Sequence, residues 1–143
     1  MSGWQAHLKL DYARAAERTV AKFEHVGPLR VLQSLYPEGN AVCHNVLVHP
    51  PSGLVGGDLL DIQLHLGADT HALLTTPGAT RFYRSEQGLA TQQVKAHVGE
   101  GARLEWMPLE TIAYNGCRGL NHAVFDLAPS AEMMAWDITA LGL

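Results

Sequence analysis

The chain has 143 residues, of which 47% are hydrophobic and 17% charged, and its formal net charge at pH 7 is −4. This length suffices for one domain with a core, and the composition is that of a globular protein. Because the net charge is weakly negative, we expect no electrostatic attraction to nucleic acid. The sequence shows neither a signal-peptide pattern at its start nor the roughly 18 consecutive apolar residues that a membrane-spanning helix needs. We therefore expect a protein that binds neither nucleic acid nor membrane.

Alternation of apolar and polar residues runs along most of the chain and predicts strands. The alternating rows, bounded by Gly, Pro and Asn, cover residues 4–12, 42–48, 60–66, 90–98, 104–106 and 123–127. The best helix candidate is "YARAAERTVAKFE" (12–24), whose second half we nevertheless expect to be a strand. A second helix candidate is "PSAEMMAWDITAL" (129–141), with Ser130 as a capping residue.

A weak internal repeat predicts strands rather than a helix for residues 129–141. Residues 64–76, 96–108 and 125–137 each show an apolar-polar-apolar triplet, a small residue, a short polar loop and an apolar strand. Leu66, Val98 and Leu127 correspond, at spacings of 32 and 29 residues. Such periods indicate stacked strand-turn-strand units. We predict a mainly β fold over residues 1–143, one elongated domain of antiparallel or solenoid-like units with few helices. His65 and His97 would then lie in one row.

The last unit is followed only by "ITALGL", so the sequence stops part-way through a further unit. An uncapped end of a stack exposes apolar faces and unpaired strand edges. We expect residues 125–143 to pair with another chain, or the sequence to be part of a longer protein.

Motifs for catalysis or tight binding are missing from the sequence. The segment "VHPPSGLVGGD" (48–58) lacks the lysine of a phosphate-binding loop and leads into a strand, so we predict that Pro50 and Pro51 stop one strand and that Gly56-Gly57-Asp58 is a tight turn. The eight histidines form neither HxH nor HExxH. Cys43 and Cys117 are expected to be free thiols, as is usual in a reducing cytoplasm. The alternative is a disulfide between them. A hydrolase that uses Glu105 and Glu110 is the weakest alternative.

Five segments carry a resemblance to a known family along essentially the whole chain. They are "HVGPLRVLQSLYPEG", "CHNVLVHPPSGLVGGD", "ALLTTPGATRFYRS", "LEWMPLETI" and "AWDITALG". In this order they resemble the urease accessory protein UreD, called UreH in some bacteria. The resemblance implies a cytoplasmic, non-enzymatic maturation factor with an elongated, β-rich fold. It also implies that the protein joins UreF and the GTPase UreG on apo-urease in a hetero-oligomer and, with the nickel carrier UreE, helps to assemble the dinickel centre.

The resemblance also implies site residues. The family is thought to pass nickel through a water-filled tunnel; Asp58 and Asp137 match acidic tunnel positions, and Thr80 matches a small residue that lines it. Nickel would be in transit there, with no cofactor tightly bound. Carboxylates along a wet passage offer weak oxygen ligands to a hydrated divalent ion. The alternative is that Asp58 caps its own turn and Asp137 is a surface residue.

Three departures from the family pattern bear on function. Ser52-Gly53 stands where the family commonly has two glycines, Leu143 ends the sequence where the family continues with Arg-Pro, and family members are roughly twice as long. We therefore interpret the sequence as an amino-terminal half. Two functions stay open: a scaffold that assists nickel delivery, and a β-rich protein-interaction scaffold with no direct metal role.

Overall fold

The computed structural model describes residues 3–49 and 53–142. Within those ranges the chain forms strands and no helix, as the predicted mainly β fold requires. The strands are β1 (Gln5–Ala15), β2 (Arg18–Val26), β3 (Arg30–Val31), β4 (Val42–Val48), β5 (Gly53–Leu54), β6 (Leu59–Leu66), β7 (His71–Thr75), β8 (Thr80–Phe82), β9 (Ala90–Val98), β10 (Arg103–Trp106), β11 (Thr111–Ala113), β12 (Gly119–Leu127), β13 (Glu132–Ala135) and β14 (Thr139–Leu141).

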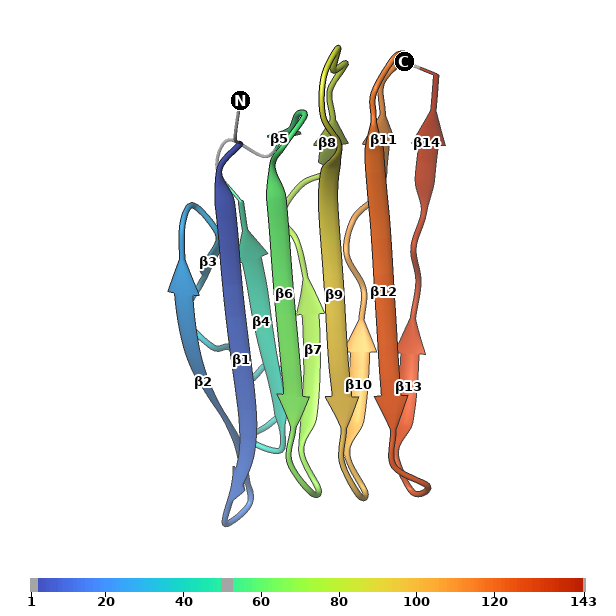
Figure 1. Cartoon of the computed structure of the whole chain (residues 1–143). Coiled ribbons are helices and arrows are strands. Elements are labelled where there is room, and N and C mark those ends of the chain that lie inside the picture. Colours follow the sequence, from blue (N-terminus) through green and yellow to red (C-terminus); the bar gives the residue numbers. More distant parts are fainter. Residues whose placement is uncertain (1–2, 50–52, 143) are drawn as a thin grey trace.

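The chain winds into four coils, each made of one long strand followed by two short strands. The coils are β1–β4–β5, β6–β7–β8, β9–β10–β11 and β12–β13–β14, with β2 and β3 added to the first. The long strands form one layer, in the order β12-β9-β6-β1-β2. The short strands form two sheets that lie end to end behind it, in the orders β13-β10-β7-β4-β3 and β14-β11-β8-β5 (Figure 1). Four flattened coils thus stack along one axis.

The register between coils confirms the repeat. Leu66 pairs with Val98, and Val98 pairs with Leu127, which are the spacings that the sequence predicts. The coils pair in parallel. In the part of the chain that the structure describes, antiparallel pairing is limited to β1–β2, β3–β4 and two isolated bridges. The fold is therefore the solenoid-like form of the prediction.

Both helix candidates are strands. The second half of residues 12–24 lies in β2 as expected, but the first half is also extended, because β1 continues to Ala15 before a tight turn at Ala16. Tyr12 is only 2% exposed and is the last inward-facing residue of β1. Tertiary pairing thus outweighs the helix propensity of this segment. Residues 129–141 contain β13 and β14, as the repeat predicts.

The core lies between the two layers. Inward-facing residues of the long strands share rows across the coils; one such row is Leu10, Leu64 and Ala96, all buried. Cys43 is buried and Cys117 is half-buried, and both are free thiols. In the last coil, β14 pairs with β11, so this coil has all three of its strands. Among the described residues, no helix is long and apolar enough to span a membrane.

Candidate functional site: a polar-walled cavity between the layers

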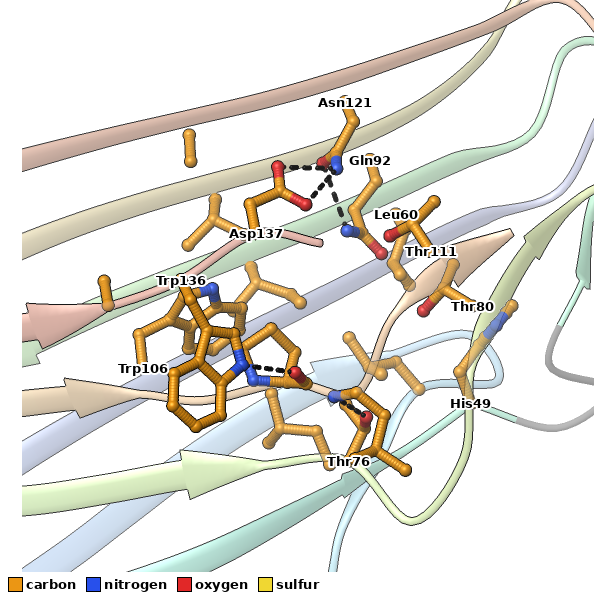
Figure 2. Close-up of a pocket in the computed structure, with 18 of the residues that line it drawn as sticks. His49, Leu60, Thr76, Thr80, Gln92, Trp106, Thr111, Asn121, Trp136 and Asp137 are labelled. Carbon is orange, nitrogen blue, oxygen red and sulfur yellow. Dashed lines mark hydrogen bonds between the residues drawn. The ribbon is translucent and has the colours of Figure 1, made fainter. Parts of the chain in front are cut away.

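A cavity of about 240 Å³ lies between the layers, well above the ~10–15 Å³ that one water needs. Its apolar wall comes from core residues such as Leu60, Ile62 and Trp106. Its polar wall carries hydroxyl, amide, imidazole and carboxylate groups, which come from all four coils (Figure 2). The polar lining residues are His49, Thr76, Thr80, Gln92, Thr111, Asn121 and Asp137.

The cavity follows the corner where each coil passes from its first short strand to its second. His49 comes directly after β4, and Asp137 lies between β13 and β14. Because β7 and β10 separate β4 from β13 in their sheet, these two residues are three strand spacings apart, or about 14 Å. Figure 2 also shows them well separated along the lining. The cavity therefore spans the stack from the first coil to the last.

The Asp137 carboxylate is held at the mouth of the cavity by an amide chain. Asn121 Nδ2 donates to both carboxylate oxygens, at 3.3 and 3.1 Å, and Gln92 Nε2 donates to Asn121 Oδ1 at 3.2 Å. Gln92 and Asn121 face each other in the β9–β12 register. Asp137 itself is exposed. A fixed, solvated carboxylate with free lone pairs can accept a cation or a water.

Hydroxyl groups form a second row on the wall. Thr80, Thr111 and Thr139 are register partners in β8, β11 and β14, and the first two line the cavity. Thr111 is only 6% exposed. Thr80, predicted as a lining residue, thus lies on the cavity beside a threonine that the sequence did not single out.

His49 is the imidazole of the wall. Its ring packs against Trp4, with 4.8 Å between the ring centroids. Its Nε2 is buried and has no hydrogen-bond partner among the described residues. Burial lowers the pKa of His49, while the charge of Asp58 acts in the opposite direction. The net effect favours a neutral ring.

Asp58 has a different setting from Asp137. It is 4% exposed, its Oδ1 accepts from Trp4 N at 3.2 Å and its Oδ2 accepts from Val55 N at 2.9 Å. The predicted tight turn is present, with a backbone hydrogen bond from Asp58 N to Val55 O and a positive φ of 89° at Gly57. Asp58 caps this turn and lies outside the cavity lining, although its charge reaches His49. Pro50 and Pro51 lie outside the described residues.

Of the three predicted site residues, Thr80 and Asp137 therefore share the cavity, and Asp58 lies outside its lining, although its charge acts on His49. Their roles toward nickel stay predictions. Gln92, Asn121 and Thr111 were missed, yet Gln92 left a signal, because it interrupts an apolar row of β9 between Ala90 and Val94. A polar residue at an inward position is costly unless it has a partner, and here the partner is Asn121.

The other predicted clusters lie outside the cavity. His65 and His97 form the predicted row on the long-strand layer, with stacked rings 5.3 Å apart and Asp11 and Asp126 beside them. Glu105 Oε2 is 2.8 Å from His71 Nε2 on neighbouring strands, which engages one carboxylate of the proposed hydrolase pair. Within residues 3–49 and 53–142 there is no group of three or more His, Cys, Asp or Glu arranged to hold a metal ion.

Comparison with known proteins identifies the family. A family model described as UreD urease accessory protein matches residues 5–143. The "Urease accessory protein UreD" of Variovorax paradoxus (strain S110) is 61% identical over 140 residues, which cover 98% of this chain and 51% of the relative. The proteins of the same name from Polaromonas sp. (strain JS666 / ATCC BAA-500) and Leptothrix cholodnii (strain ATCC 51168 / LMG 8142 / SP-6) are 61% and 58% identical, with the same coverage. The chain spans about half the length of the curated relatives that it matches, and it belongs to the UreD family of urease accessory proteins.

Proposed function

We propose that this chain forms part of a non-enzymatic, cytoplasmic scaffold that assists nickel delivery from the GTPase UreG to apo-urease. UreF would be a further partner in the complex. The support is family membership together with the names of the relatives, which describe accessory proteins of urease. In this proposal the chain holds no resident cofactor, and nickel is cargo.

The observation that carries the proposal is a cavity that spans four coils and has an acidic mouth. A hydrated divalent ion moves most easily where protein oxygens replace the waters that it loses. Asp137 would offer a carboxylate, Thr80 and Thr111 hydroxyl groups, and Asn121 an amide oxygen. Because no closed metal site is present among the described residues, such a wall binds weakly and releases its cargo.

In the same proposal Asp137 and Asp58 have different roles. Asp137 and Thr80 contact the ion directly, since both line the cavity. Asp58 shapes the end of the cavity at His49, in the first coil. Its carboxylate oxygens hold the backbone of Trp4 and Val55, and its charge acts on His49. Its effect on nickel should therefore come through folding, so a test has to measure nickel per folded complex.

The alternative is a protein-interaction scaffold without a metal role. It is favoured by the last coil, where large apolar side chains are exposed; Met134 is 59%, Trp136 44% and Ile138 58% exposed. Exposed apolar surface at an unpaired sheet edge is typical of a docking surface. Both functions are compatible with one molecule, so the test has to measure assembly and nickel separately.

The test uses a chimera in which this chain replaces the matching half of the Variovorax paradoxus relative. Asp137→Ala is compared with Asp126→Ala, which removes an equally charged side chain from the outer face of β12. We expect both variants to form the complex with UreF and urease, and only Asp137→Ala to lower the nickel content of purified urease. Unchanged nickel in Asp137→Ala would leave the interaction scaffold as the better account.

A further inference from the structure

Trp136 lies at the boundary between the cavity and the solvent. It lines the cavity beside Asp137, yet it is 44% exposed (Figure 2). Trp106, which lines the same cavity from the neighbouring coil, is only 6% exposed. The Trp106 indole is therefore part of the core, whereas the Trp136 indole separates the cavity from water.

The Trp136 indole is held in place by hydrogen bonds to the third coil. Its Nε1 donates to Pro108 O at 2.8 Å, and the backbone N of Trp136 donates to Trp106 O at 3.2 Å. The backbone N of Leu109, next to Pro108, donates to Thr76 Oγ1 of the second coil at 3.0 Å. Pro108, Leu109 and Thr76 all line the cavity. These bonds tie the corners of three successive coils together and fix the ring at the cavity wall.

A large side chain matters at this position because the last coil has little else to place over the cavity. The register partner of Trp106 in the last coil is Ala135, which is exposed. Ala135 lines the cavity with a single methyl group. In the described part of the chain, no strand lies beyond the last coil. Removal of the Trp136 ring would therefore open the cavity to water at the last coil.

Asp137 provides the charge at this boundary. Its carboxylate is exposed and held by Asn121, and no ion pair with it is present in the described part of the chain. The other titratable group of the described lining is His49, whose pKa is lowered by burial, so that its ring is uncharged at neutral pH. An opening beside one unpaired carboxylate attracts cations and repels anions.

We propose that the Trp136 indole restricts the mouth of the cavity, so that small ions enter past the Asp137 carboxylate and cations are admitted in preference to anions. The ring supplies the barrier, and the carboxylate supplies the selectivity for charge. This inference goes beyond the proposed function, because it concerns any small cation and holds whether or not nickel is the cargo.

The test measures how fast small charged reagents reach a thiol inside the cavity of the 143-residue chain. Thr111→Cys places the thiol on the cavity wall, at a position that is 6% exposed. Cys117→Ser removes the half-buried native thiol, and Cys43 stays as a buried reference. Two methanethiosulfonates are compared, one with a cationic aminoethyl group and one with an anionic sulfonatoethyl group. Mass spectrometry measures the reaction at each thiol, and each rate is divided by the rate of the same reagent with a free thiol.

With Trp136 in place, we expect the cationic reagent to modify the introduced thiol about tenfold faster than the anionic reagent, the low end of the effect of a cleft lined by one sign of charge. Asp137→Ala should remove most of this preference. Trp136→Ala should raise both rates by about tenfold, because the reagents then no longer wait for a local opening of the wall. It should also reduce the preference for the cation, since entry is no longer confined to the path past Asp137.

Met134→Ala is the matched control. It truncates a side chain of the same coil that is 59% exposed and lies outside the cavity lining, so we expect both rates to stay as they are. The proposal is overturned if Trp136→Ala leaves both rates unchanged, if Met134→Ala raises them as much as Trp136→Ala does, or if the two reagents react equally fast while Trp136 is present.

Cys43 distinguishes an opened cavity from an unfolded chain, because it is fully buried. A Trp136→Ala chain in which Cys43 reacts as fast as the introduced thiol has unfolded. Trp136→Leu, which keeps an apolar side chain without a ring, then decides by the same criteria.

This inference and the nickel passage fail separately. Unchanged urease nickel in the Asp137→Ala chimera would contradict the nickel passage, and a cation preference that depends on Trp136 in the isolated chain would still support the barrier. Lower urease nickel in the Asp137→Ala chimera, together with thiol rates that Trp136→Ala does not change, would overturn the barrier and leave the passage standing.

Discussion

The first and the last coil of the described chain differ although they share one repeat. The first coil is covered by β2, an antiparallel edge strand that carries charged residues such as Lys22 and Glu24. The last coil has no strand beyond it among the described residues, and the inward positions of its long strand are exposed or only half-buried. Met133 is 38% exposed, whereas its register partner Leu104 is fully buried; Leu127 and Val98 differ in the same way. Burial in this fold therefore depends on having a neighbouring coil on both sides.

The largest difference should appear when matched core positions are truncated. We expect Leu104→Ala to lower the free energy of unfolding by about 2–5 kcal/mol, since it opens a cavity between packed coils. Met133→Ala, at the paired position of the last coil, should cost about 1 kcal/mol or less. Urea unfolding followed by tryptophan fluorescence measures both. Equal losses would show that the last coil is as well packed as the third.

The two aspartates should differ nearly as much. Asp58→Ala leaves two backbone N–H groups near the first coil without their carboxylate acceptor, so we expect a loss of about 2–3 kcal/mol. Asp137→Ala removes an exposed side chain of the last coil and should cost about 0.5 kcal/mol. Urea midpoints for the two variants check this order, and a reversed order would mean that Asp137 is the structural residue.

Association should depend on the last coil rather than the first. If the exposed apolar groups of β13 and the following segment dock another copy of the chain, Met134→Lys with Ile138→Lys should weaken self-association by about tenfold, or ~1.4 kcal/mol. Phe23→Lys, on the charged edge strand β2, is the matched control because Phe23 is 47% exposed. Sedimentation equilibrium distinguishes them. A chain that stays monomeric at all concentrations would contradict this use of the last coil.

The smallest effect concerns the buried phenol of the first coil. Burial raises the pKa of Tyr12 well above its usual value, with smaller contributions from Cys43 and Tyr36, and its hydroxyl donates to Asn45 Oδ1 at 2.8 Å. The Tyr12 phenol ionises near pH ~10 in the unfolded chain but stays protonated in the folded chain at that pH. The free energy of unfolding that this group contributes is therefore fully present below pH ~10 and decreases as the pH rises above it. Tyr12→Phe should cost about 1 kcal/mol at pH 7 and flatten the alkaline decline. A decline of the same slope in the variant would mean that another group causes it.

The repeat and the strands were predictable because a period of two and a spacing of 32 then 29 residues are written in the sequence. The cavity was not predictable, because its wall residues are brought together by the pairing of strands from different coils. Asn121, for example, meets Gln92 only because β12 pairs with β9. The place of His49 on the wall was not predictable either, because a lone histidine matches no ligand spacing. The extended first half of residues 12–24 required knowing that β6 lies beside β1.

The most direct test of the central claim is the nickel content of urease per folded accessory complex, measured in the chimera for Asp58→Ala and Asp137→Ala. We predict that Asp137→Ala lowers nickel per urease while the amount of complex is unchanged. Asp58→Ala should lower nickel only as far as it lowers the amount of folded complex. Full nickel content in the Asp137→Ala complex would contradict the claim that this cavity is the passage.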